Sequence, residues 1–204
     1  MKLVLASNNA GKLAELQSLF APLGLALVRQ GDLGIPEAEE PHVSFIENAL
    51  AKARHAARHA HSAAIADDSG LCVDALGGAP GVRSARYAED HGQAKGDASN
   101  NRVLLARLSA IVKVHERSAR FVCALVAVRS ADDPQPLVAM GRWAGVIWPA
   151  PRGDSGFGYD PLLYIPELAH TVAELSPQDK NEHSHRGLAS REMLRQMREV
   201  WGLG

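Results

Sequence analysis

The sequence has few of the features that staple small proteins together or anchor them in membranes. Its 204 residues include only two cysteines, Cys72 and Cys123, which are far apart and form no CxxC pair. A disulfide scaffold and a cysteine-based zinc site are therefore excluded, and we expect both cysteines to be small core residues in a reducing compartment. The apolar stretch at 3–6 ends at Ser7, too short for a signal peptide or a membrane span. We therefore expect a soluble cytoplasmic protein with no membrane partner.

The sequence also lacks an excess of positive or negative charge. Lysine and arginine number 22 against 23 acidic residues, the net charge is −1, and only six residues are lysine. A nucleic-acid-binding domain usually carries a basic surplus on one face, so we expect no nucleic-acid partner. Hydrophobic residues make up 46% of the chain, and a chain of this length buries roughly 70% of its unfolded surface. These values exclude a disordered protein, and the length suits either one large domain across residues 1–204 or two small lobes packed as one.

Hydrophobic spacing predicts alternating strands and helices. Ser44 is the expected N-cap of a long helix, with Glu47 completing a capping box and an apolar stripe formed by Ile46, Leu50, Ala53, Ala57 and Ala60. The expected strands are 3–6, 25–28, 63–66 and a hairpin of 120–128 with 137–148, and the expected helices are 12–20, 45–61, 99–112 and 188–200. This order predicts an α/β fold with a mixed sheet.

The first polar loop, Ser7-Asn8-Asn9-Ala10-Gly11-Lys12, follows a strand and opens a helix. Free N–H groups and the helix dipole favour an anion at that position, and Lys12 adds a positive charge. The loop is not a Walker A motif, because Ala6 and Leu13 stand where that motif needs glycine and a hydroxyl residue. The loop therefore indicates either a phosphate site or an ordinary turn.

Acidic residues form a second candidate site. Asp67 and Asp68 follow a predicted strand, where ligand crevices of α/β proteins form. Adjacent strand residues point to opposite sides, so we expect one aspartate to face a ligand and the other to support the backbone. Glu39 and Glu40 lie on a proline-rich acidic loop. Mg²⁺ binds one or two carboxylates together with phosphates and water, so a metal–polyphosphate site and simple solvated turns both remain open.

Two further segments contain residues that could bind a ligand. In the loop 153–161, glycines flank Phe157, which would let the backbone approach a flat ligand and offer a stacking face. Lys180 and the pair His185-Arg186 supply donors suited to phosphate or to the oxo groups of a base. A tight loop with a core phenylalanine and a basic helix flank are the structural alternatives.

Taken together and in order, these motifs closely resemble the inosine triphosphate pyrophosphatase family. The matching stretches span residues 7 to 187 and comprise SNNAGK (7–12), FIENA (45–49), ADDSGL (66–71), GGAPGVRSARY (77–87), GFGYDP (156–161) and SHRG (184–187). The resemblance implies an elongated mixed sheet with flanking helices, forming two lobes around a deep central cleft. It also implies a homodimer and Mg²⁺-dependent hydrolysis of non-standard purine nucleoside triphosphates (ITP, dITP, XTP) to a monophosphate and pyrophosphate, which keeps these nucleotides out of DNA and RNA.

Family roles carry over onto the matching positions. Asp68 matches the catalytic acid, both a metal ligand and the proton acceptor for the attacking water, and Glu39 matches the second metal ligand, with Glu40 as the alternative register. The substrate contacts implied by the resemblance are Ser7, Asn8, Asn9, Ala10, Gly11, Lys12, Ser69, Phe157, Gly158, Tyr159, Asp160, Lys180, His185 and Arg186. Asn8 stands where glycine is usual, a position that asparagine tolerates.

Two other functions use the same features. A phosphotransferase would need an acceptor site and is disfavoured by the missing Walker A pattern. A nucleotide-binding sensor would hold the triphosphate without turnover. Release of pyrophosphate separates the hydrolase from both.

Overall fold

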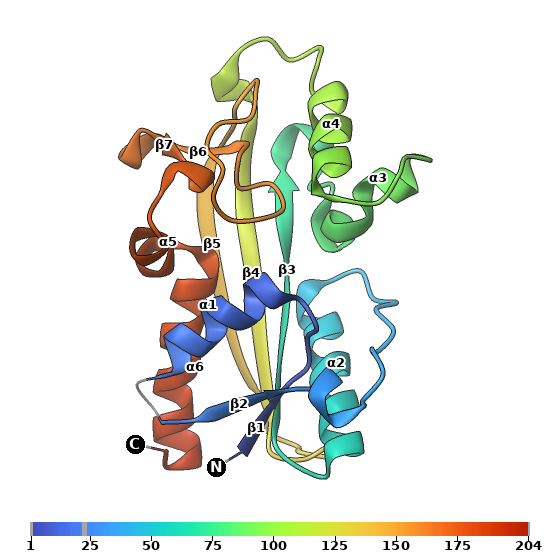
Figure 1. Ribbon diagram of the computed structural model, residues 1–204, viewed down its shortest axis with the longest axis vertical. Helices are drawn as coiled ribbons and strands as arrows, with labels where there is room; N and C mark the ends of the chain where they lie inside the picture. Colours follow the sequence, from blue (N-terminus) through green and yellow to red (C-terminus); the bar gives the residue numbers. More distant parts are fainter. Residues whose placement is uncertain (1, 22–23, 204) are drawn as a thin grey trace. The chain divides into compact units, whose positions relative to one another are not determined.

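The computed structural model describes residues 2–21 and 24–203 (Figure 1). In these residues strands and α-helices alternate as far as residue 73, and two α-helices, four strands and two further α-helices then follow. The strands are β1 (Lys2–Leu5), β2 (Ala26–Arg29), β3 (Ala64–Val73), β4 (Ser118–Val128), β5 (Leu137–Ile147), β6 (Leu163–Ile165) and β7 (His170–Thr171). The helices are α1 (Ala10–Phe20), α2 (Phe45–Ala60), α3 (Tyr87–Asp90), α4 (Asp97–Arg107), α5 (Pro177–His183) and α6 (His185–Trp201). No helix among the described residues is long and apolar enough to cross a membrane.

The strands form one seven-stranded sheet in the order β2-β1-β3-β4-β5-β6-β7. β1 pairs in parallel with β2 and β3, whereas β6 pairs antiparallel with β5 and β7. The sheet is therefore mixed and the fold is α/β, which confirms the predicted class. The predicted hairpin forms β4 and β5, which are neighbours in the sheet.

The chain divides into two compact units. Unit 1 comprises Met1–Asp68, Cys123–Gly141 and His185–Gly204, and unit 2 comprises Ser69–Val122 and Arg142–Ser184. The chain passes from one unit to the other within β3, β4 and β5, and again between α5 and α6. Each unit has its own apolar core.

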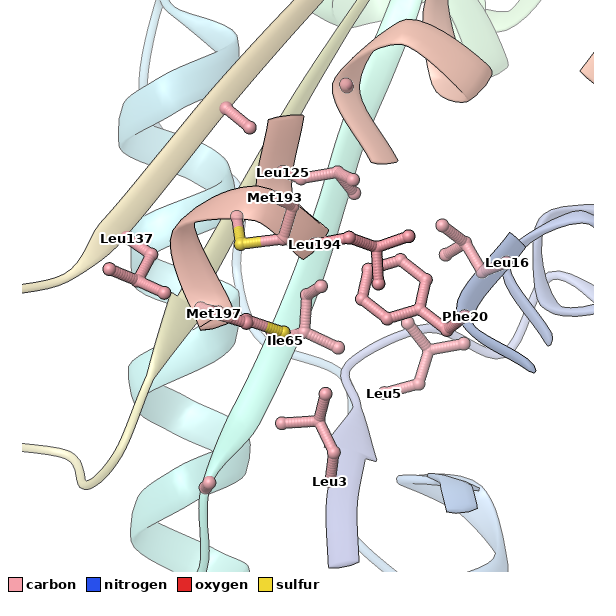
Figure 2. Close-up of a cluster of buried hydrophobic side chains, with 14 of the residues drawn as sticks. Leu3, Leu5, Leu16, Phe20, Ile65, Leu125, Leu137, Met193, Leu194 and Met197 are labelled. Atoms are coloured by element: carbon pink, nitrogen blue, oxygen red, sulfur yellow. The ribbon is translucent and has the colours of Figure 1, made fainter. Parts of the chain in front are cut away.

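Unit 1 is a three-layer arrangement with helices on both faces of its strands. On one face, α1 and α6 bury large side chains against the strands, among them Leu16, Phe20 and Met193 (Figure 2). On the other face, α2 packs through alanines, including Ala49, Ala53 and Ala56. Unit 2 has a core of Leu71, Val73, Tyr87, Leu104, Phe121, Trp143 and Tyr159 with their neighbours.

Several predicted boundaries are wrong. β3 does not end at Ala66 but continues through the two aspartates to Val73, and α6 begins at His185 rather than at Leu188. The predicted stripe of α2 is largely confirmed, because Ala53 and Ala57 are buried and Leu50 and Ala60 pack against the same core. Ile46 is the exception: it is 40% exposed, whereas Asn48 and Ala49 are buried. Alanines allow a helix to lie close to a sheet, so backbone proximity here outweighs the burial of the larger side chain. Cys123 is buried as expected, but Cys72 is only half-buried.

Candidate active site

The predicted phosphate loop connects β1 to α1 as expected. The side chain of Asn9 is the N-cap of α1 and accepts a hydrogen bond from the Lys12 N–H at 2.9 Å. The Asn9 N–H donates to Ser7 Oγ at 3.2 Å, and Asn8 Nδ2 donates to Glu37 Oε1 at 3.0 Å. Ser7 through Lys12 therefore form a turn at the positive end of an 11-residue helix, stabilised by the side chains of Ser7 and Asn9 and by the bond from Asn8 to Glu37.

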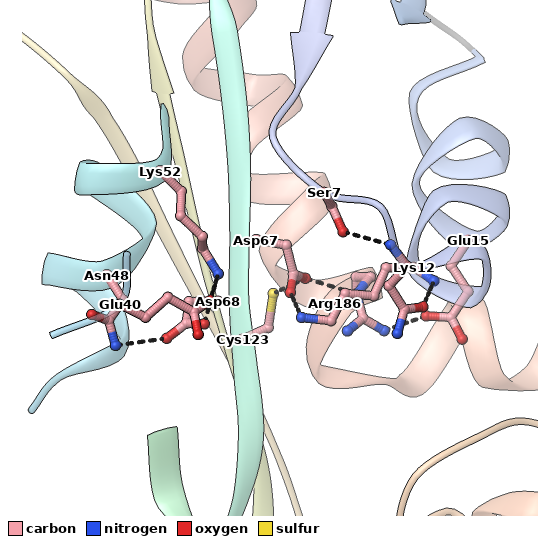
Figure 3. A network of polar contacts seen from close by, with 11 residues as sticks. Ser7, Lys12, Glu15, Glu40, Asn48, Lys52, Asp67, Asp68, Cys123 and Arg186 are labelled. Atoms are coloured by element: carbon pink, nitrogen blue, oxygen red, sulfur yellow. Dashed lines mark hydrogen bonds and ion pairs between the residues drawn. The ribbon is translucent and has the colours of Figure 1, made fainter. Parts of the chain in front are cut away.

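Asp67 and Asp68 lie side by side in β3 and point to opposite faces of the strand (Figure 3). This alternation is the one the sequence predicts. Asp67 faces α1 and α6, and Asp68 faces α2. The two carboxylates therefore have different partners and different properties.

Asp67 is completely buried in a network of cations. Its Oδ1 lies 2.6 Å from Lys12 Nζ, and its Oδ2 accepts from Arg186 Nε at 2.8 Å and from the Cys123 thiol at 3.3 Å. Arg186 also pairs with Glu15 on α1. Burial alone would raise the pKa of Asp67, but Arg186 and Lys12 lower it well below its usual value. Asp67 is therefore ionised and holds α1 and α6 to the strand.

Asp68 lies among side chains of α2. Its Oδ1 is 2.8 Å from Lys52 Nζ, and its Oδ2 accepts from Asn48 Nδ2 at 3.4 Å. Lys52 Nζ also lies 2.8 Å from Glu40 Oε1, so one ammonium group stands against two carboxylates. Burial raises the pKa of Asp68 above its usual value, although Lys52 opposes the shift. Asp68 thus binds a proton more readily than an ordinary aspartate.

The acidic loop reaches this cluster through Glu40. Glu39 is exposed, whereas Glu40 is half-buried on Lys52. Among the described residues, no group of three or more His, Cys, Asp or Glu side chains is gathered as a metal cage. The structure therefore brings Glu40 to Asp68 and leaves Glu39 beside it on the loop.

The other predicted residues of unit 1 lie in the first turn of α6. His185 is 5% exposed and Arg186 is 1% exposed. The sequence suggests two basic donors flanking a helix, but the Arg186 guanidinium is paired with carboxylates from α1 and β3.

The remaining predicted residues belong to unit 2. Phe157, Gly158, Tyr159 and Asp160 form a turn in which Asp160 Oδ2 accepts from the Phe157 N–H at 2.9 Å and from Lys180 Nζ at 2.7 Å. The same ammonium lies 4.7 Å from the centre of the Phe157 ring, a cation–π contact. Ser69 is half-buried on β3. The structure thus joins Lys180 to the Phe157 loop as one cluster.

Two contact residues of unit 1, Glu15 and Lys52, lie outside the motifs quoted from the sequence, and a third, Asn48, lies in the FIENA motif but is given no role there. Asn48 and Lys52 are four residues apart on α2, and this spacing places them on one helix face. A polar pair at that spacing among alanines is a signal that the sequence does contain. Glu15 has no such signal, because its partner Arg186 is 171 residues away.

Fold and contacts together define an α/β protein in which lysines are paired with carboxylates around β3 and in the turn 157–160. Comparison with known proteins gives the family. The family model described as "Ham1 family" matches residues 3–196. The chain is 59% identical over 201 residues to a dITP/XTP pyrophosphatase of Paracidovorax citrulli, covering 98% of this chain and 100% of that protein. It is 60% identical over 209 residues to one of Methylibium petroleiphilum, covering 98% and 99%. The chain belongs to the Ham1 family.

Solved structures agree with the fold. A HAM1 protein from Coxiella burnetii superposes with a TM-score of 0.89 at 44% identity, covering 98% of this chain and 100% of that one. The Ham1 protein of Staphylococcus aureus gives a TM-score of 0.82 at 36% identity, covering 96% and 97%.

Proposed function

We propose that this protein is a nucleoside triphosphate pyrophosphohydrolase that converts ITP, dITP and XTP to the monophosphate and pyrophosphate. The observation that carries the proposal is the pair of strand aspartates, one locked by Lys12 and Arg186 and the other beside Lys52 with a raised pKa. The names of the relatives, at about 60% identity over the full chain, support the same activity. We further propose a cytoplasmic homodimer that removes non-standard purine nucleotides before they enter DNA or RNA.

The triphosphate would bind at the start of α1. The loop from Ser7 to Lys12 ends at the helix N-terminus, where backbone N–H groups and the dipole favour anions. Lys12 is already placed by Asp67, which limits the orientations its side chain can take. A cation held in advance stabilises the charge that develops on the leaving pyrophosphate without a reorganisation cost.

Asp68 is the proposed proton acceptor for the attacking water. A carboxylate with a raised pKa is a better base than an ordinary one, and Lys52 keeps it ionised by lowering that pKa. Asn48 donates to the second oxygen and so limits rotation of the carboxylate. The alternative of a passive sensor would not require this pairing.

The donor set beside Lys52 fits Mg²⁺. Asp68 and Glu40 present carboxylate oxygens to one cationic position, and hard oxygen ligands are what Mg²⁺ prefers. When bound, Mg²⁺ would neutralise phosphate charge and polarise the scissile bond. Asp68 is the proposed first ligand, and Glu39 the second as the family pattern implies, with Glu40 as the alternative.

The purine base would be bound by the second cluster. Phe157 offers an aromatic face, Gly158 to Asp160 shape the turn, and Lys180 is held against it. Ser69, His185 and Arg186 are the remaining proposed nucleotide contacts. Hypoxanthine and xanthine carry acceptor oxygens where adenine carries an amine, so donor side chains would discriminate by up to about 10⁴-fold.

Pyrophosphate release tests the function. Purified protein is incubated with Mg²⁺ and ITP, dITP, XTP, ATP or GTP, and pyrophosphate and orthophosphate are measured separately. We expect pyrophosphate from the first three and far less from ATP. Conversion of the triphosphate to the nucleoside diphosphate in the presence of an acceptor, without pyrophosphate, would indicate a phosphotransferase, and binding without turnover would indicate a sensor. Equal rates on ATP and ITP would refute the selectivity.

Site variants test the roles. Asp68→Asn should lower kcat by about 10²- to 10⁴-fold, the usual contribution of a general base, while the melting temperature shows that the protein is folded. Asp32→Asn, an exposed aspartate paired with Arg29, is the matched control and should be fully active. Glu39→Gln and Glu40→Gln decide which residue is the second ligand. Only the substitution that removes the true ligand should raise the Mg²⁺ concentration needed for half-maximal activity.

A further inference from the structure

Gly158, the second residue of the Phe157 loop, is held from outside the loop by α4. Its φ of +64° lies in the left-handed region that favours glycine. Its N–H donates to Asp97 Oδ2 at 2.7 Å, and its carbonyl accepts from Asn101 Nδ2 at 3.1 Å. Both backbone groups of one residue are therefore fixed by side chains of a single helix.

The spacing of the two α4 residues suits this task. Asp97 and Asn101 are four residues apart, so they lie on one face of the helix one turn from each other. Asp97 is also the first residue of α4, where a negative charge is stabilised by the dipole. A rigid helix rather than a neighbouring loop thus sets the position of Gly158.

Asn101 makes this contact at a cost. It is 9% exposed, and its Oδ1 is buried with no hydrogen-bond partner among the described residues. A buried acceptor without a donor destabilises a protein. The neighbouring Asn100 differs, since its side chain accepts from the Ala88 N–H and donates to the Ala85 carbonyl. Of the two polar groups of the Asn101 amide, only the NH₂ group is hydrogen-bonded to a residue that the structure describes, and its partner is the Gly158 carbonyl.

The other residues of the turn 157–160 are held by contacts that do not involve α4. Asp160 holds the Phe157 N–H and Lys180, and the Tyr159 hydroxyl donates to the Ser84 carbonyl at 2.9 Å. The Gly158 N–H belongs to the peptide group that joins Phe157 to Gly158, so its hydrogen bond to Asp97 fixes the orientation of that peptide and with it the backbone ψ of Phe157. Releasing Gly158 would remove one constraint on the backbone beside the ring, while the bond to Asp160 and the contact with Lys180 would remain.

We infer that Asp97 and Asn101 are positioning residues that orient Phe157 for binding the purine base. The inference rests on the proposed function, which assigns the base to this loop. Neither side chain needs to touch the nucleotide, because both act through the backbone of Gly158. Their loss should weaken substrate binding and leave the hydrolytic step at Asp68 unchanged.

The experiment compares truncations on one helix. Asp97→Ala and Asn101→Ala should each raise KM for ITP by about tenfold, the scale of one lost hydrogen bond to a charged or buried group, with kcat within about twofold. Asp97→Asn retains an acceptor oxygen and should restore KM. Asn100→Ala removes a neighbouring buried amide that does not touch Gly158, and its KM should stay at the wild-type value. Calorimetric affinity for inosine 5′-monophosphate gives a readout independent of turnover and should weaken by the same factor.

The outcomes separate this inference from the proposed function. If Phe157→Ala raises KM but Asp97→Ala and Asn101→Ala do not, the positioning role is wrong and the base loop stands. If Phe157→Ala changes neither KM nor monophosphate affinity, the base loop is wrongly assigned and the positioning role is overturned with it. An equal rise in KM for Asn100→Ala, or a fall in kcat at constant KM, would also overturn it. If the wild type released no pyrophosphate, the activity would fail, and monophosphate affinity would still decide the positioning role.

Discussion

We expect Asp67→Asn to lower the free energy of unfolding more than the same substitution at an exposed aspartate. Asp67 shares its carboxylate between Lys12 at 2.6 Å and Arg186 at 2.8 Å, and its side chain is completely buried. Asparagine has nearly the same shape but no charge, so both cations lose their common partner. Removing one member of a buried ion pair typically costs 3–5 kcal/mol.

The structure places the expected loss at the lower end of that range. Arg186 keeps its pairing with Glu15 and so is not left wholly uncompensated. We therefore expect about 3 kcal/mol, which for a protein of this size corresponds to a fall in melting temperature of roughly 6 to 12 °C. The measurement is thermal unfolding at neutral pH followed by circular dichroism.

At acidic pH the difference in melting temperature between the wild type and Asp67→Asn should disappear. The pKa of Asp67 is well below its usual value in the folded protein, so the stability it supplies is complete above the unfolded pKa and is lost as the pH falls through the folded pKa. The melting curves of wild type and Asp67→Asn should thus approach one another below about pH 4. Asp32→Asn, on an exposed pair, is the control and should melt with the wild type. If Asp67→Asn melts within 2 °C of Asp32→Asn, or if the gap persists undiminished in acid, the reasoning is wrong.

Three shorter predictions concern other contacts. Lys52→Gln removes the cation that lowers the pKa of Asp68, so the acid limb of the kcat/KM profile should move to higher pH; an unmoved limb would separate Asp68 from the titrating base. Gly141→Ala would drive a Cβ into the backbone carbonyl of His185, so we expect a loss of about 1–3 kcal/mol in chemical unfolding. Tyr159→Phe deletes a buried hydrogen bond to a backbone carbonyl and should cost about 1 kcal/mol by the same measurement, whereas an unchanged midpoint would show that the bond adds nothing.

Local features of the fold follow from the sequence because the interactions that create them are local. Ser44 caps α2 as predicted, through a hydrogen bond that spans three residues. The alternation of Asp67 and Asp68 about β3 follows from strand geometry alone. These features need no knowledge of the rest of the chain.

The length of β3 did not follow, because two adjacent aspartates normally end a strand. Here the charge of Asp67 is compensated by Arg186, which is 119 residues away, and that of Asp68 by Lys52 on α2. No local pattern reports such pairings. The same reason explains why Glu15 was missed and why Glu40, rather than Glu39, lies on Lys52.

The sequence by itself determined the α/β class, the order of the motifs and the chemical nature of the candidate site, since residue type and spacing carry that information. Only the tertiary structure decided which carboxylate meets which cation. Burial and charge compensation depend on partners brought together from distant parts of the chain, and they make Asp67 a structural anion and give Asp68 a raised pKa.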